Sequence, residues 1–343
     1  MGGRKIRNME EFAAKSGISR PTVSKYFNDP ESVKPTTRMR IEEALERFDY
    51  RPNIYAINQN RQLTKTIGIV VPYLADPFFA EIARYLETLC IDAGYSPSLF
   101  SSHGRPDLEN DNLDTLRSMK PAGVLIAPLG RTSDREVVEQ LCRDVPTVLF
   151  DSNIEGIGDV FVGSDNPQFT SLMVSYLCRT GEAPSFFEMK TPPNPNARKR
   201  RTGFLEAMQS LGHTPQIFEA EGEGWALEEI GLQEGIRFIE SGEMKTKTVL
   251  CSNDRLAIGF LAACYQKGLR VGITDDCDLR VAGMDGHPFS GFTCPSLTTV
   301  SHDYEAISER SVETLFGMIA NGSGSGARSE KLFEGKLLLR SSA

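Results

Sequence analysis

Several polar side chains of this chain stand directly after apolar runs, where they could act on a bound molecule. Asp165, Asn253 and Asp285 each end an apolar, strand-like run. The carboxyl ends of parallel strands meet at one edge of a sheet, which is where open α/β sheets bind ligands. Carboxylates and a carboxamide form hydrogen bonds with hydroxyl groups. The pattern therefore predicts a site for a small polar molecule.

Two further features fit the same chemistry. Phe79, the second of two adjacent phenylalanines, follows the first apolar run, and its ring could stack on a sugar; two phenylalanines that open a helix are nevertheless more often core. The run "NARKRRTGF" at 196–204 carries four cations, and a planar guanidinium suits vicinal hydroxyls or a carboxylate. For Arg198, Lys199 and Arg201, a solvated helix face is the favoured interpretation.

An enzyme is a poor alternative. The histidines are dispersed, and neither metal-ligand spacing nor a glycine-rich phosphate loop after a strand is found. Asp165 and Asp285 could form an acid pair, but they lack a basic or nucleophilic partner. We expect binding without catalysis, and neither a metal nor a cofactor.

A second group of chemistry-bearing residues lies in "SGISRPTVSKYFND", residues 16–29. Gly17 permits the left-handed residue that ends one helix, and Ser19 can cap the next. Val23 would point inward, leaving hydroxyls and cations for solvent or a ligand. A short helix with such an exposed front fits the major groove of DNA. A solvated surface helix is the alternative.

The charge distribution favours DNA. The chain has 343 residues and a net charge of −8, but residues 1–65 hold 13 Lys and Arg against 8 Asp and Glu. A basic segment on an acidic chain indicates a polyanionic partner for that segment alone.

The elements that must position these residues follow from periodicity. Helical stripes predict helices at 9–16, 20–28 and 35–48, packed around Phe12, Val23, Ile41 and Leu45. From residue 66, apolar strands alternate with amphipathic helices in two halves, which predicts two parallel sheets with a ligand cleft between them. The expected strands are 67–72, 95–102, 123–129, 146–152, 159–165, 183–189, 216–221, 248–253 and 279–285. The expected helices are 78–94, 107–119, 133–143, 196–211, 226–241 and 254–267.

The motifs "SGIS", "TVS" and "YRPN" at their spacing closely resemble the lactose-repressor/galactose-repressor (LacI/GalR) family, and the resemblance extends through the whole chain. It implies an all-α helix-turn-helix headpiece (1–50), a hinge segment (51–65) and an α/β core of two parallel-sheet subdomains like a periplasmic binding protein (66–343). The first subdomain would span about 66–162 and 296–322, and the second about 163–295 and 323–343.

The resemblance also implies roles on DNA. Arg20, Pro21 and Lys25 would read bases. The DNA backbone would be contacted by Ser19, Thr22, Ser24 and Asn28. The hinge positions would be Asn53, Ala56 and Gln59, and here the chain departs from the family, because Gln59 replaces a leucine that wedges into the minor groove. Strong kinking of the operator is therefore in doubt.

In the core, Arg200, Asn253 and Asp285 match the family's effector-binding positions, and Trp225 stands where the family often has an aromatic lid. With Asp165 and Phe79 they suit a polyhydroxylated effector. A sugar or sugar derivative is the first expectation, and a purine or nucleoside is the alternative. An exported solute-binding protein with the same core is the competing class.

We therefore expect a ligand-responsive transcription regulator that binds a pseudo-palindromic operator as a homodimer. Repression relieved by an inducer is the favoured sign, with corepression and activation left open. The seven scattered cysteines, without any CxxC, indicate reduced thiols, and no signal peptide or membrane-length apolar run is found. These features predict a cytoplasmic protein with no membrane contact.

Overall fold

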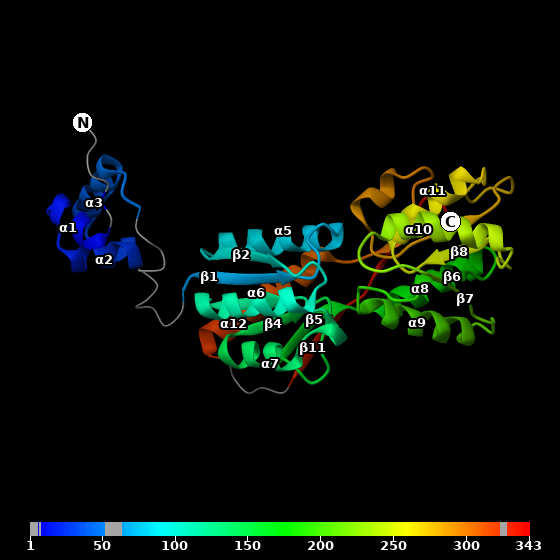
Figure 1. The fold of residues 1–343 in the computed structure, drawn as a ribbon, viewed down its shortest axis with the longest axis horizontal. Helices are drawn as coiled ribbons and strands as arrows, with labels where there is room; N and C mark the ends of the chain where they lie inside the picture. Colours follow the sequence, from blue (N-terminus) through cyan, green and yellow to red (C-terminus); the bar gives the residue numbers. More distant parts are fainter. Residues whose placement is uncertain (1–5, 7, 52–63, 323–327) are drawn as a thin grey trace. The chain divides into compact units, whose positions relative to one another are not determined.

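The computed structural model describes residues 6, 8–51, 64–322 and 328–343, apart from the side chain of Asn28 (Figure 1). The chain divides into two compact units, Met1–Thr64 and Lys65–Ala343. We use "headpiece" for the first unit and "core" for the second. None of the described helices is long and apolar enough to cross a membrane.

The headpiece consists of short capped helices, as the periodicity predicts. The side chain of Asn8 accepts a hydrogen bond from the Glu11 amide at 2.8 Å, and Gly17 ends the first helix with a φ of 67°. Phe12, Val23 and Ile41 are fully buried and form the centre of a small core. The elements are α1 (Met9–Ser16), α2 (Arg20–Asn28), the 3-10 turn η1 (Pro30–Ser32) and α3 (Pro35–Phe48).

The first lobe of the core is built on a six-stranded sheet in the order β11-β5-β4-β3-β1-β2, with parallel neighbours. Its strands are β1 (Thr66–Val71), β2 (Ser96–Ser101), β3 (Gly123–Ile126), β4 (Thr147–Phe150), β5 (Val160–Ser164) and β11 (Ser329–Phe333). Successive residues of each strand point to opposite faces of the sheet and pack into two separate apolar layers, so helices cover both faces. One face packs against α5 (Pro77–Asp92) and α12 (Tyr304–Asn321), and the other against α6 (Pro106–Met119) and α7 (Arg135–Asp144).

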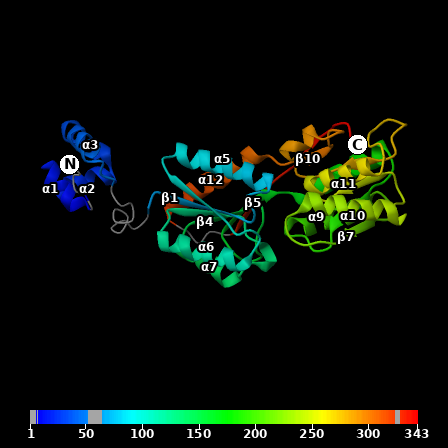
Figure 2. The same ribbon diagram turned by 45° about the horizontal axis from the view of Figure 1, so that its top comes forward.

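The second lobe repeats this plan with a four-stranded parallel sheet in the order β7-β6-β8-β9. Figure 2 shows this lobe, coloured green to yellow, with helices packed on its sheet. Its strands are β6 (Ser185–Met189), β7 (Gln216–Ala220), β8 (Thr248–Cys251) and β9 (Arg280–Ala282). Apolar layers on both faces join the sheet to its helices. Those helices are α10 (Leu227–Ser241) and α11 (Asp254–Gln266) on one face, and α8 (Asn166–Thr180) and α9 (Asn196–Ser210) on the other.

The segments that connect the lobes shift the expected subdomain boundaries. The sequence assigns 323–343 to the second subdomain, but β11 pairs with β5 in the first lobe. The sequence assigns 296–322 to the first subdomain, but β10 (Thr299–Ser301) pairs antiparallel with β12 (Lys336–Leu338), and Thr298 bridges to β9. The sequence does not predict β11, because this edge strand is largely exposed and lacks the continuous apolar run that marks the other strands of its sheet.

Candidate ligand and nucleic-acid sites

The front of α2 is the exposed, chemistry-bearing surface of the headpiece. Ser19 caps the helix by accepting a hydrogen bond from the Thr22 amide at 3.3 Å, and the two hydroxyls lie 2.7 Å apart. Arg20 and Lys25 are exposed, and neither makes an ion pair with another residue in the part of the chain that the structure describes. Val23 faces the opposite way and is fully buried. The helix thus presents one exposed cation at its first residue, Arg20, and another in its last turn, Lys25, and both are open to an anionic partner.

The remaining predicted DNA contacts are only partly observable. Pro21 is exposed in the first turn of α2, and Ser24 is half-buried on the following turn. The side chain of Asn28 lies outside the described residues, as do Asn53, Ala56 and Gln59. The roles assigned to all of these residues remain predictions.

In the core, Arg200 on α9 holds together the polar ends of several elements. Its Nε donates to Asn166 Oδ1 at 2.9 Å, at the start of α8, and one terminal nitrogen donates to the Ser252 carbonyl at 2.8 Å, after β8. The other terminal nitrogen lies 2.5 Å from Asp285 Oδ1. Arg200 is only 4% exposed, so its whole guanidinium is used inside the protein. Sequence reasoning selected both Arg200 and Asp285, and the structure brings them into contact.

Asp285 continues this network towards the first lobe. His302 Nε2 lies 3.2 Å from Asp285 Oδ1, and His302 Nδ1 lies 2.6 Å from the hydroxyl of Ser164, at the end of β5. Burial raises the pKa of Asp285, but Arg200 and His302 outweigh it and hold that pKa below its usual value. Burial lowers the pKa of His302 more than Asp285 raises it. The network is therefore an anionic carboxylate between a guanidinium and a neutral imidazole.

A second contact between the lobes has unused hydrogen-bonding capacity. Asn196 Nδ2, at the start of α9, donates to the carbonyl and to Oδ1 of Asp151, just after β4, at 3.1 and 3.0 Å. Asp151 Oδ2 and Asn196 Oδ1 are buried and have no hydrogen-bond partner in the described part of the chain. Burial raises the pKa of Asp151 to about 7, against the opposing effect of Lys199 and Arg200. Such unpaired buried atoms call for an explanation, and a bound polar ligand supplies one.

A third contact is part ionic and part aromatic. Arg255 on α11 lies 3.1 Å from Asp76, which caps α5, and donates to the Trp225 carbonyl at 2.8 Å. The Trp225 ring stacks on Tyr73 with centroids 5.1 Å apart and meets Phe79 edge-on at 6.1 Å. The predicted lid residue therefore lies against the first lobe. Phe79 is only 1% exposed and packs in the apolar layer of α5.

The other two predicted residues begin helices. Asp165 accepts a hydrogen bond from the Gln168 amide at 3.0 Å and caps α8, while Asn253 accepts one from the Leu256 amide at 2.8 Å and caps α11. One oxygen of each is therefore already bound. Their contact with a ligand remains a prediction.

We use "polar cluster" for the residues of these contacts between the lobes: Arg200, Asp285, His302, Asp151, Asn196, Asp76 and Arg255. Several of them were not predicted from the sequence. Asp151 follows a strand, and the rule that selected Asp165 and Asp285 would have found it. His302 gave no such signal, because its role depends on a β10–α12 connection that periodicity did not predict. The other missed members are Asp76, Asn196 and Arg255.

Comparisons with known proteins match this architecture. Residues 8–53 match the family model described as bacterial regulatory proteins, lacI family, and residues 180–343 match that of a periplasmic binding protein-like domain. The chain is 28% identical to the ribose operon repressor of Escherichia coli (strain K12) over 326 residues, covering 92% of this chain and 93% of the relative. It is 26% identical to the HTH-type transcriptional regulator MalR of Streptomyces coelicolor over 347 residues, covering 97% and 96%.

Solved structures share the fold. A lac repressor dimer bound to operator and the anti-inducer ONPF superimposes with a TM-score of 0.82 at 23% identity, covering 99% of each chain. A LacI family transcriptional regulator from Enterococcus faecium with bound ribose superimposes with a TM-score of 0.68 at 19% identity. That likeness covers 81% of this chain and 98% of the other.

Proposed function

The chain belongs to the lacI family of bacterial regulatory proteins, and from this membership we propose that it is a repressor whose operator binding responds to a small polar effector. The observation that carries the proposal is the union, in one chain, of a helix-turn-helix headpiece with free cations on α2 and a two-lobed core with a buried polar cluster.

The headpiece binds DNA through α2. Arg20 and Lys25 read base edges in the major groove, together with Pro21, and the hydroxyls of the first turn contact phosphates. A homodimer places two such helices in successive major grooves, about one helical turn apart, on a pseudo-palindromic operator. Residues 51–65 form the hinge between headpiece and core.

The core binds the effector at the polar cluster. Asp151 Oδ2 and Asn196 Oδ1 are unpaired acceptors, and hydroxyl groups are the donors that satisfy them. Trp225 stacks on Tyr73 beside the cluster and is buried there, so a ligand would reach its ring only after this stack opens. This combination favours a sugar or sugar derivative, in line with a relative named ribose operon repressor. A purine or nucleoside is the second candidate, because it also combines a flat apolar surface with hydroxyls.

Two finer statements complete the proposal. The protein is a regulator without catalytic activity, since the acids of the cluster are engaged with Arg200, His302 and Asn196. The one hydroxyl described next to His302, that of Ser164, is itself buried. It acts in the cytoplasm, where its DNA is.

Regulation follows from the contacts between the lobes. The Asp285–His302, Asp151–Asn196 and Asp76–Arg255 pairs join the two lobes, so a ligand that rearranges them changes the geometry of the lobes. Converting a 99% DNA-competent population to 99% incompetent requires roughly a 10⁴-fold preference, or about 5.5 kcal/mol.

Thermal denaturation against a panel of sugars, sugar acids, polyols and nucleosides tests the effector assignment. A ligand at about 100 times its Kd stabilises the protein by about 2.7 kcal/mol. Wild type should respond to a member of this panel, and Asp285→Ala should not. A ligand that stabilises both proteins equally would place its site elsewhere.

A further inference from the structure

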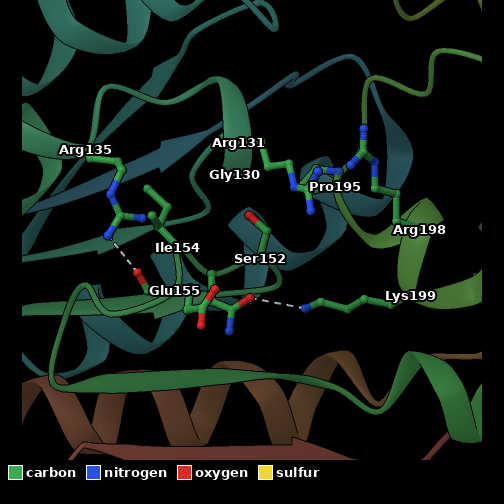
Figure 3. A pocket seen from close by; sticks show the side chains of 10 residues that line it. Gly130, Arg131, Arg135, Ser152, Ile154, Glu155, Pro195, Arg198 and Lys199 are labelled. Atoms are coloured by element: carbon green, nitrogen blue, oxygen red, sulfur yellow. Dashed lines mark hydrogen bonds between the residues drawn. The ribbon is translucent and has the colours of Figure 1, made fainter. Parts of the chain in front are cut away.

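A cavity of about 510 Å³ lies between the two lobes of the core, beside the polar cluster. The first lobe contributes residues from the loops after β3 and β4, and the second lobe contributes the start of α9 (Figure 3). Ser152 and Pro195 line it, and they are the chain neighbours of Asp151 and Asn196. A molecule in the polar cluster could therefore extend into this cavity.

The lining is strongly basic. It holds Arg131, Arg135, Arg198 and Lys199 against a single carboxylate, Glu155. None of the four cations makes an ion pair with any residue that the structure describes. Like charges that line one cavity repel one another, and a bound anion would offset that repulsion.

The hydrogen bonds of these cations leave most of their donors free. Arg135 donates to the Glu155 carbonyl at 2.9 Å, and Lys199 Nζ donates to Asn153 Oδ1 at 3.3 Å (Figure 3). Lys199 is half-buried, and burial lowers its pKa against the attraction of Asp151 and Glu330. A partly desolvated ammonium that has no close ion pair within the described residues gains from a bound anion.

We propose that this cavity binds a phosphate group, supplied either by the effector itself as a phosphate ester or by free inorganic phosphate. Three guanidinium groups and an ammonium match the charge and the acceptor oxygens of a phosphate dianion better than those of a single carboxylate. Glu155 is exposed and can turn towards solvent or pair with a displaced arginine. As an ester site, the inference rests on the proposed function and narrows the effector to a phosphorylated polyhydroxylated molecule.

Calorimetric titration of the full-length protein tests this with five probes: inorganic phosphate, ribose 5-phosphate, glucose 6-phosphate, ribose and glucose. We expect at least one phosphate compound to bind, and R198Q/K199Q to weaken that binding by about tenfold or more. The matched control is R270Q/R310Q, which removes the same charge from exposed ion pairs elsewhere on the core and should change affinity by less than about twofold.

The two sources separate by comparison of the probes. An ester that binds at least about tenfold more tightly than inorganic phosphate assigns the group to the effector, and equal affinities assign it to free phosphate. If R198Q/K199Q does not fold, Arg131→Gln, on an exposed loop, replaces it and should weaken the same titration.

Three results would overturn the inference: no phosphate compound binds, binding survives in R198Q/K199Q, or the control variant loses as much affinity. Its failure is distinct from failure of the proposed function. A protein that binds operator DNA and releases it with neutral ribose or glucose, yet binds none of the three phosphate probes, keeps the function and lacks this site.

Discussion

Arg200 is the residue on which the effector site depends most. Its guanidinium makes one contact with each of three groups, and the alignment of those groups requires a planar fork. Arg200→Lys keeps the charge but loses the fork, so we expect effector affinity to fall by about tenfold or more while operator affinity is unchanged. Thermal shift and fluorescence anisotropy measure the two quantities. Equal loss of both would mean that Arg200 supports only the fold.

Lys25 provides a residue-scale test in the headpiece. It is exposed and makes no ion pair in the described part of the chain, so it is free to contact a base edge. Lys25→Ala should relax specificity at one base pair of each half-site, at a cost of about 1–3 kcal/mol. Affinities for a set of single-base operator variants measure this. A uniform loss across all sequences, with a smaller salt slope, would instead identify a phosphate contact.

Asp151 makes protein stability depend on pH. Its pKa is raised to about 7, well above that of an exposed aspartate in the unfolded chain. The extra proton of the folded protein stabilises it fully below the unfolded pKa of about 4, and this stabilisation is lost as pH rises from about 4 to about 7. Asp151→Asn should stabilise the free protein at about pH 8, by roughly 1–4 kcal/mol, and should have little effect at about pH 4. Denaturation midpoints of both proteins at both pH values check this, and an equal gain at both would show that the carboxylate is not protonated.

At the scale of elements, the closest packing in the core is between α10 and α11. A Cβ on Gly259 would lie 2.1 Å from the Glu228 carbonyl oxygen, a backbone atom that cannot yield without moving the helix. Gly259→Ala should therefore destabilise the core by about 2–3 kcal/mol. Gly317 on α12 is the matched control, since its Cβ would meet nothing within 4 Å, and Gly317→Ala should stabilise by about 0.5–1 kcal/mol. Urea denaturation of both variants checks the pair, and two changes of the same sign would contradict this packing.

Most of the elements could be predicted from the sequence. Local signals were sufficient where a cap or an apolar run coincides with an element, as at Asn8, Ser19 and the strand β1. Local signals did not predict β11, whose residues are mostly exposed, or the helix α12.

The site could be predicted less completely than the fold. Position after a strand selected Asp285, and the resemblance selected Arg200. The partners across the lobes could not be predicted, because Asp76 and Arg255 are 179 residues apart and no local pattern joins them. Phe79 was predicted to face the ligand cleft because it follows a strand, but its side chain is packed in the core. Position after a strand therefore selects some residues that cannot contact a ligand.

At the scale of the whole molecule, operator binding by the headpiece must be coupled to effector binding by the core. The effector must bind one arrangement of the lobes better than the other, and the difference in affinity sets how far operator occupancy can shift. By reciprocity, bound operator DNA must change effector affinity by the same factor.

The most direct test of that coupling is operator affinity measured with and without effector, for wild type and for Arg200→Lys. The operator comes from selection on a random DNA library, and the effector from the thermal shift panel. At an effector concentration just sufficient to saturate wild type, we expect at least about a tenfold change in wild-type operator affinity and a clearly smaller change in Arg200→Lys, whose effector affinity is lower. An operator affinity that stays the same when the core is saturated would contradict it, because headpiece and core would then be independent.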